Sequence, residues 1–384
     1  MPGERRRVTD LPRGWPVGFG RGEDERPAVV VLAALRSVRP RRLREIAWQL
    51  GSAQSCLAAV RTGKVSGPAD RGIANTVDGE ELLDRVAACG ARVALPGDEE
   101  FDPRLLDLAD PPAVLFVQGR VLAPGTQRVA IVGSRRPTDT GCDVAESLGA
   151  ALAAGGVWVA SGAAQGIDRA AHRGALTAGG PTVAVLAEGI GARHGGWRGS
   201  LLRKVADCGS ILSECAPGVP ADRYRFPARN RIVAALASAV VVVEGAERSG
   251  SLITAGHAAD LGRAVLAVPG SVVNPQSAAT FALLDEGARP VRHARDVCEA
   301  ADIPFDEAAI AARRAALRGG VDPIEARVLD AVGDGVLPEH VADGAGLTLP
   351  DTLACLLRLE LRGLVRSDGG RFRRSLDASA LEPR

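Results

Sequence analysis

The sequence predicts an α/β protein built around a doubly wound, mostly parallel β-sheet, with a helical module before the sheet and a winged helix after it. Two patterns predict this class. From about residue 92 to residue 296, short valine-rich runs alternate with alanine-rich helical stretches, and such near-continuous apolar runs are typical of strands buried on both faces. On either side of this region, apolar residues recur at helical spacing.

Six runs in the central region are expected to be strands, and the stretches between them helices. We expect strands at 129–132, 157–160, 182–186, 211–213, 239–243 and 264–268, and helices that include 143–154, 168–178, 232–237 and 253–261. Repeated β-α units of this kind predict a doubly wound sheet.

The flanking regions give the domain organisation. We expect a disordered tail over residues 1–27, a helical module over 28–91, the Rossmann-like domain over 92–301, a linker over 302–321, a winged-helix domain over 322–375 and a second tail over 376–384. The winged helix is predicted from three helical runs followed by two short strands around Asp368, Gly369 and Gly370, a typical hairpin turn.

Two of these flanking segments raise the question of DNA contact. The segment from Ser37 to Leu50 could form a helix-hairpin-helix, but Val38-Arg39-Pro40-Arg41 replaces the Gly-x-Gly turn of that motif, so packing is favoured there. In the winged helix, the third helix is largely apolar and weakly basic, and a protein contact suits it at least as well as a DNA groove.

Composition limits the classes of function. The formal net charge is +1, so a nucleic-acid contact must be a local patch, and the arginine-rich basic content could reflect a GC-rich genome. Seven scattered cysteines without a C-x-x-C pair, no zinc-ligand spacing, no signal peptide and no membrane-length apolar run predict a cytoplasmic protein without structural metal or cofactor.

Four short clusters follow predicted strands and carry the functional prediction. They are Gly133-Ser134-Arg135-Arg136, the run from Ser161 through Gly162 and Gly166 to Asp168, Phe226-Pro227-Ala228-Arg229-Asn230-Arg231, and Arg248-Ser249-Gly250-Ser251. The carboxyl ends of parallel strands meet at one edge of a sheet, so these clusters are expected to line one crevice. Small residues let backbone N–H groups approach phosphate, and guanidinium groups bind it in a bidentate manner, so the crevice should favour polyanions.

Other chemistries fit the residues less well. The G-x-G-x-x-G fingerprint of dinucleotide sites is missing after Gly133, although Arg135 considered alone could equally be a solvated side chain. Asp168 and His172 are four residues apart and could hydrogen-bond on one helical face, but a structural role is favoured because no nucleophile accompanies them. Neither the pair Ser249 and Ser251 nor the pair Glu214 and Glu244 has catalytic spacing, so a non-enzymatic protein is expected.

Taken in order, the motifs resemble the DNA-processing DprA/Smf family over about residues 101–297. The resemblance rests on Val129 to Arg135, Ser161 to Asp168 with Ala171 to Leu176, Ser213-Glu214, Phe226 to Ile232, Ser249 to Ala255, and Ala267 to Gly270. It implies a homodimer that binds single-stranded DNA, protects it and loads the recombinase RecA during natural transformation. It further implies an extended Rossmann fold with a DNA pocket made of Ser134, Arg135, Gly162, Gly166, Arg229, Asn230, Arg231, Ser249, Gly250 and Ser251. We add Gly133, Arg136, Ser161 and Phe226, which belong to the same clusters, to the predicted site.

The chain departs from the family pattern in two places. Gly189 to Gly195 replaces Gly-x-Asp-x-x-Tyr-Pro, and Ala279 to Leu284 replaces Gly-x-Asn-x-Leu-Ile. After the first departure, the family pattern no longer predicts the shape of one pocket wall. After the second, it no longer predicts a turn near the sheet edge. Three alternatives therefore remain: a diverged paralogue with another ligand, a nucleotide-signal sensor, or a phosphoribohydrolase, although the last lacks the acid expected after the Ser249 loop.

Overall fold

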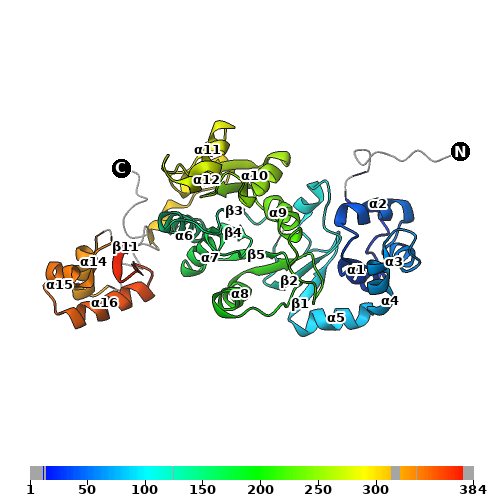
Figure 1. The fold of residues 1–384 in the computed structure, drawn as a ribbon, viewed down its shortest axis with the longest axis horizontal. Helices are drawn as coiled ribbons and strands as arrows, with labels where there is room; N and C mark the ends of the chain where they lie inside the picture. Colours follow the sequence, from blue (N-terminus) through cyan, green and yellow to red (C-terminus); the bar gives the residue numbers. More distant parts are fainter. Residues whose placement is uncertain (1–11, 13, 124, 313–320, 334, 375–384) are drawn as a thin grey trace.

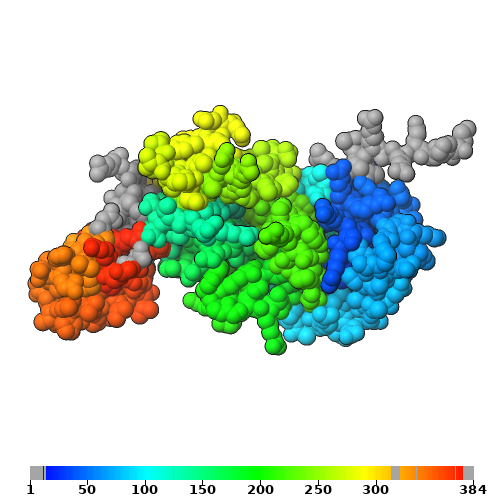
Figure 2. All heavy atoms as spheres, viewed as in Figure 1, coloured from blue at the N-terminus to red at the C-terminus, as the bar shows by residue number. Residues whose placement is uncertain are grey.

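The computed structural model describes residues 12, 14–123, 125–312, 321–333 and 335–374 (Figure 1). A central sheet lies between an N-terminal group of helices and a smaller C-terminal unit, and Figure 2 shows these two groups at opposite ends of the central domain. No helix within the described ranges combines the length and the apolar content needed to cross a bilayer.

The described residues form a nine-stranded sheet in the order β1-β2-β6-β5-β4-β3-β7-β8-β9. Strands β3 to β9 pair in parallel, while β1 and β2 form an antiparallel edge next to β6. The strand order reverses between β3 and β7, which makes this the switch point of the sheet. The strands are β1 (Ala91–Ala94), β2 (Leu115–Gly119), β3 (Arg128–Val132), β4 (Trp158–Ser161), β5 (Thr182–Leu186), β6 (Ser210–Ser213), β7 (Ala239–Val242), β8 (Ala264–Ala267) and β9 (Arg289–Pro290).

Helices cover both faces of the sheet. Val129 and Ile131 of β3 pack against α6 (Asp139–Ala154), α7 (Ile167–Thr177) and α12 (Ala294–Ala300). Ala130 and Val132 face the opposite layer, made by α9 (Arg225–Leu236), α10 (Gly250–Asp260) and α11 (Ala278–Asp285). This alternation confirms the predicted doubly wound class. The remaining helices of the domain are α8 (Gly196–Cys208) and the 3-10 turns η2 (Pro103–Asp107) and η3 (Pro275–Ser277).

Three strands were not predicted from the sequence. Strands β1 and β2 form an antiparallel pair without a crossover helix, so the β-α alternation that revealed the other strands gives no signal for them. Strand β9 has only two residues, both exposed, and therefore lacks an apolar run.

The N-terminal helices share a core with the edge of the sheet. They are α1 (Glu25–Ala33), α2 (Pro40–Leu50), α3 (Ala53–Arg61), α4 (Pro68–Thr76) and α5 (Gly79–Ala88). The expectation of a disordered tail over residues 1–27 is wrong for residues 14–27, which pack against the N-terminal helices. The rings of Trp15 and Phe19 stack with centroids 4.4 Å apart, Phe19 is buried, and Arg44 Nε donates to the carbonyl of Gly14 at 2.9 Å. Residues 1–11 and 13 of that tail lie outside the described ranges.

The C-terminal unit contains three helices and a hairpin. These are α14 (Pro323–Ala331), α15 (Pro338–Ala345), α16 (Leu349–Leu361), β10 (Val365–Asp368) and β11 (Arg371–Arg374), and they enclose a small core of their own. Its assignment as a winged helix stays a prediction. Residues 313–320 of the expected linker and the expected tail over 376–384 lie outside the described residues.

Ion pairs connect the hairpin of this unit to the central domain. Arg366 and Arg373 both contact the carboxylate of Asp143 in α6, and Arg366 also pairs with Glu146 one turn later. Asp143 is buried, and that burial raises its pKa while the two guanidinium groups oppose the shift. Charge, rather than a shared apolar core, therefore holds this unit to the sheet domain.

Two loops at the carboxyl edge of the sheet pack closely enough to require glycine. Gly166, at the start of α7, has a φ of +87°, and a Cβ there would lie 2.3 Å from the carbonyl oxygen of Ser134. That carbonyl accepts a hydrogen bond of 3.1 Å from the N–H of Ile167. The loop after β3 is thereby fixed against the first turn of α7.

We predict that Gly166→Ala destabilises the protein by about 2–4 kcal/mol, because it adds both backbone strain and a steric overlap. The matched control is Gly250→Ala, since a Cβ at that exposed position meets nothing within 4 Å. Urea unfolding of the two variants measures the difference. Equal free energies of unfolding for both variants would contradict the close packing of the two loops.

A second prediction concerns His172, which is fully buried in α7. Its Nδ1 lies 2.7 Å from Thr182 Oγ1, and because that hydroxyl donates to Val159 O, Nδ1 must carry the proton and donate. Burial lowers the pKa of His172 to about 3, whereas an unfolded histidine titrates near 6.5. The unfolded chain therefore binds more protons between these two values, and stability falls as the pH falls through this window.

We expect His172 to lower the free energy of unfolding by at most about 1.4 kcal/mol per pH unit as the pH falls from about 6.5 toward about 3. Urea unfolding at several pH values, compared between the wild type and His172→Gln, isolates this contribution, because all other titrating groups are shared. The same pH slope in both proteins would contradict the assignment.

Candidate nucleic-acid-binding site

A cavity of about 560 Å³ opens at the carboxyl ends of β3, β4 and β7, where the strand order reverses. Loops leave the sheet in opposite directions at such a switch point, which creates a crevice between them. Segments far apart in sequence meet there, as the four clusters predicted. The predicted site residues that line the cavity are Gly133, Ser134, Arg135, Arg136, Gly162, Phe226, Arg229, Asn230, Ser249, Gly250 and Ser251.

The lining of the cavity includes four exposed arginines. Arg135 and Arg136 come from the loop after β3, Arg223 from the segment before α9, and Arg248 from the loop before α10. Among the described residues, none of the four forms an ion pair with a carboxylate. Their charges are therefore available to a ligand, and guanidinium groups in this state bind phosphate oxygens well.

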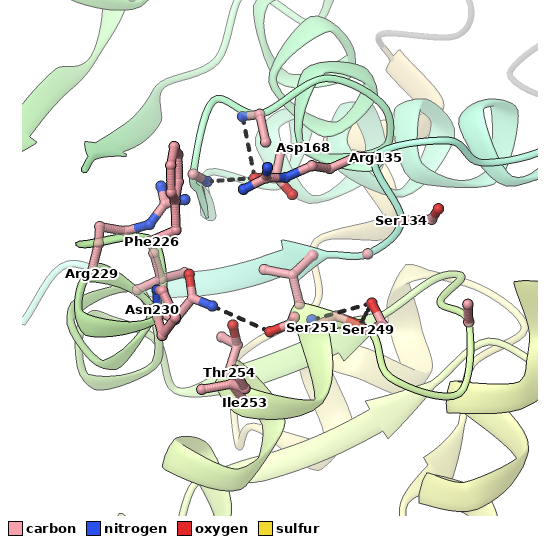
Figure 3. A pocket seen from close by; sticks show the side chains of 18 of the residues that line it. Ser134, Arg135, Asp168, Phe226, Arg229, Asn230, Ser249, Ser251, Ile253 and Thr254 are labelled. Carbon is pink, nitrogen blue, oxygen red and sulfur yellow. Dashed lines mark hydrogen bonds between the residues drawn. The ribbon is translucent and has the colours of Figure 1, made fainter. Parts of the chain in front are cut away.

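One of these arginines is stacked on an aromatic ring. The guanidinium carbon of Arg135 lies 4.7 Å from the ring centroid of Phe226, and Figure 3 shows the two side chains side by side at one end of the cavity. The stacking fixes the direction of the guanidinium group while leaving its N–H groups free. Phe226 is only half-buried, so part of its ring also remains open to solvent.

Backbone groups line the cavity on its other side. Helix α10 begins at Gly250, and Ser249 caps it by accepting a hydrogen bond of 3.3 Å from the N–H of Ser251. Asn230 Nδ2 donates to the carbonyl of Gly250 at 3.2 Å and so holds α9 against this turn (Figure 3). The positive end of the α10 dipole thus lies at the cavity, where it favours an anion.

Arg229 belongs to the floor of the cavity rather than to its rim. The side chain is buried, its Nη1 donates to the carbonyl of Val185, and its guanidinium packs where a Cβ of residue 162 would stand, which explains Gly162. Asp168 lies nearby and accepts the N–H of Gly162 at 3.1 Å. Burial raises the pKa of Asp168, while the charge of Arg229 opposes the shift.

Three predicted site residues lie outside the cavity, which corrects the sequence-based grouping. Arg231 is buried on another face of α9, where Nη2 contacts Glu214 Oε1 at 2.7 Å and Nε lies 3.1 Å from Asp110 Oδ2. Two residues on from Arg229, its side chain leaves the helix in a different direction. Ser161 is buried and donates to Ile131 O at 2.7 Å, and Gly166 packs under Ser134. All three support the scaffold.

The groups examined for catalysis are held in structural contacts. The hydrogen bond considered between Asp168 and His172 is replaced by one from His172 to Thr182, and Asp168 binds backbone N–H groups. Glu244 accepts from the backbone N–H of Thr138 at 2.8 Å, and Glu214 is engaged by Arg231. These contacts brace the loops at the carboxyl edge of the sheet.

The cavity also contains residues that the predicted site did not include. Arg223 lies before α9, and Arg248 belongs to one of the four clusters but not to the predicted pocket. The arginine-rich run from Arg223 to Arg231 is the sequence signal that could have indicated Arg223. Which of its members point into the cavity depends on how α9, which begins at Arg225, packs against the sheet. Further lining residues are Asp168, Pro227, Ile253, Thr254 and Gln276.

The two departures from the family motifs lie away from the cavity lining. Gly191 to His194 line a separate cavity of about 780 Å³, together with Arg85, Arg198 and Glu188. The second departure forms most of α11. Neither departure contributes a residue to the lining of the main cavity.

Comparison with known proteins gives consistent matches. The family model described as DNA recombination-mediator protein A matches residues 92–302. The putative DNA processing protein DprA of Mycobacterium tuberculosis is 38% identical over 320 residues, which are 79% of this chain and 82% of the relative. Protein Smf of Escherichia coli is 36% identical over 287 residues, covering 72% of this chain and 76% of the relative.

A solved structure agrees with these sequence matches. The X-ray structure of DNA processing protein A from Streptococcus pneumoniae superposes with a TM-score of 0.57 at 31% identity, and the match covers 65% of this chain and 87% of that chain. The match of the family model spans the sheet domain that carries the cavity. This chain therefore belongs to the DNA recombination-mediator protein A family, the family of the DprA and Smf DNA-processing proteins.

Proposed function

We propose that the cavity at the switch point binds single-stranded DNA through its phosphates, and that the protein acts by binding rather than by catalysis. The observation that carries this proposal is the set of four arginines, Arg135, Arg136, Arg223 and Arg248, which line one cavity without carboxylate partners among the described residues. The DNA-processing names of the relatives support DNA as the polyanion.

The shape of the site favours an unpaired strand over a duplex. The cavity is a recess lined by loops and by the first turns of α9 and α10, and a backbone has to enter it to reach the arginines. An unpaired strand can place a phosphate on the arginines and a base on the open part of the Phe226 ring. A duplex keeps its bases stacked inside and would offer only its backbone.

The wider role follows from the family. The description of the family as a recombination mediator supports the proposal that the bound strand is protected and passed to the recombinase RecA. A homodimer would place two cavities on one strand and raise the avidity of binding. We place this activity in the cytoplasm, where incoming DNA and the recombinase would meet.

We predict that Arg135→Ala combined with Arg248→Ala weakens binding to oligothymidylate by roughly tenfold or more, and lowers the slope of log affinity against log salt by about two. The matched control is Arg42→Ala with Lys64→Ala, which removes the same charge from exposed positions that do not line this cavity. Fluorescence anisotropy across a salt series measures both quantities.

If the arginine variant binds oligothymidylate with the same affinity as the control variant, the assignment of this cavity as the binding site is refuted. Turnover of nucleoside monophosphates by the wild type would instead favour the phosphoribohydrolase alternative. A small ligand retained through purification would favour the nucleotide-signal sensor.

Phe226 provides a separate test of base stacking. We expect Phe226→Ala to cost about 1–3 kcal/mol of binding free energy for an oligonucleotide, whereas Phe226→Tyr keeps most of the affinity because it keeps the ring. The same measurements on an abasic strand should show no difference between the wild type and Phe226→Ala. A loss of equal size on both strands would mean that Phe226 acts only by supporting Arg135.

A further inference from the structure

A second cavity, of about 400 Å³, lies between the N-terminal helices and the sheet domain. Its walls come from the end of α1, the start of α2, the ends of β5 and β6, and α9. Three of its lining residues, Pro227, Arg229 and Ile253, also line the switch-point cavity, so the two cavities share a wall. We call this second space the interdomain cavity.

The loop between α1 and α2 brings positive charge to the interdomain cavity. Arg36, Arg39 and Arg41 line it, and all three are exposed. Among the described residues neither Arg36 nor Arg39 forms an ion pair, and Arg41 has only a contact of 3.9 Å with Glu45. This rim therefore resembles the rim of the first cavity in having guanidinium groups that are free for an anion.

A buried carboxylate holds this loop in place. Asp70 is fully buried and accepts the backbone N–H groups of Arg36 at 2.7 Å, Ser37 at 3.0 Å and Val38 at 3.0 Å. Because the loop backbone is fixed, the side chains of Arg36 and Arg39 leave it from defined positions. Arg39 lies over the ring of Tyr224, with its guanidinium carbon 5.2 Å from the centroid, and Tyr224 donates to the carbonyl of Arg36 at 2.9 Å.

The start of α2 adds backbone donors to the same rim. This helix of 11 residues begins at Pro40, and no side chain caps it. Pro40 has no N–H group, but Arg41 carries one and lines the cavity together with Pro40, so the positive end of the helix dipole lies at this rim and favours an anion.

The interior of the interdomain cavity suits a base rather than a second phosphate. Leu35, Val38 and Ile232 supply apolar surface. Deeper in, Arg231 is buried with Nη1 lacking a hydrogen-bond partner, next to the carboxylates of Glu214 and Asp110. A heterocycle with donors and acceptors along one edge can satisfy both kinds of group, whereas a phosphate would face the two carboxylates.

The wall between the two cavities presents an apolar ridge. Ile253 of α10 is 41% exposed, and Pro227 at the start of α9 is also exposed. Stacked or packed bases can cross such a ridge while the sugar-phosphate chain follows the arginines on either side.

We propose that the single strand bound at the switch point continues over Pro227 and Ile253 into the interdomain cavity, where Arg36 and Arg39 bind its phosphates and the apolar interior receives a base. The N-terminal helical module then becomes part of the DNA groove instead of a separate packing unit. This inference rests on the proposed function of the first cavity and assigns that function a second contact site.

The test compares strands of two lengths. Because the two cavities share a wall, only a strand of about two or three nucleotides should fill the switch-point cavity alone, whereas one of about twenty should reach both. We expect Arg36→Ala with Arg39→Ala to bind the long strand roughly tenfold more weakly than the wild type, with a salt slope lower by about two, while its affinity for the short strand stays within about twofold. Fluorescence anisotropy on the full chain measures all four affinities.

The controls separate this inference from the proposed function. Arg42→Ala with Lys64→Ala removes equal charge from the same helical module at residues outside the cavity lining and should bind both strands like the wild type. Arg36→Lys with Arg39→Lys should restore most of the long-strand affinity if charge is what matters. Circular dichroism on each variant confirms that the module is folded.

Each outcome has a distinct meaning. If the arginine variant and its control bind the long strand equally, the second contact site is refuted while the first can stand. If the arginine variant loses the short strand as strongly as the long one, the two cavities do not act in sequence along a strand, and the inference is again refuted. If the wild type binds neither length, the proposed function itself fails.

Discussion

The close contact between two loops at the carboxyl edge of the sheet shapes the rest of the site. The turn at Gly166 lies against the carbonyl of Ser134, and the N–H of Ser134 donates to the carbonyl of Glu244 at 2.6 Å. The loop after β3 is thereby held between the start of α7 and the end of β7. Because its backbone is fixed on both sides, Arg135 and Arg136 project into the cavity from defined positions.

The arginines of the sheet domain divide into two groups with different physical roles. Arg128, Arg229 and Arg231 are buried, and carboxylates or backbone carbonyls engage them. Burying a guanidinium group is costly unless it is paired, so these residues serve the scaffold. Arg135 and Arg248 are exposed and unpaired among the described residues, and they give a protein of near-neutral net charge a local positive surface.

The separate units of the chain meet the sheet domain through different forces. The N-terminal helices share an apolar core with the sheet edge and enclose a cavity with it, so their position relative to the switch point is fixed. The C-terminal unit has its own core and contacts α6 through Arg366 and Arg373. One attachment therefore depends on apolar burial, and the other on partly buried ion pairs.

The sequence by itself determined the doubly wound class, the strands at the centre of the sheet and the four clusters at its carboxyl edge, because apolar periodicity and strand-end glycines are local signals. Tertiary structure decided which arginines face the cavity: Arg229 and Arg231 are two residues apart, yet one forms the cavity floor and the other is buried with Glu214. It also brought Arg36 and Arg39 next to α9 from nearly two hundred residues away. The helical period separates the directions of the two arginines, but which face of α9 meets the cavity and which distant segments lie beside it depend on packing.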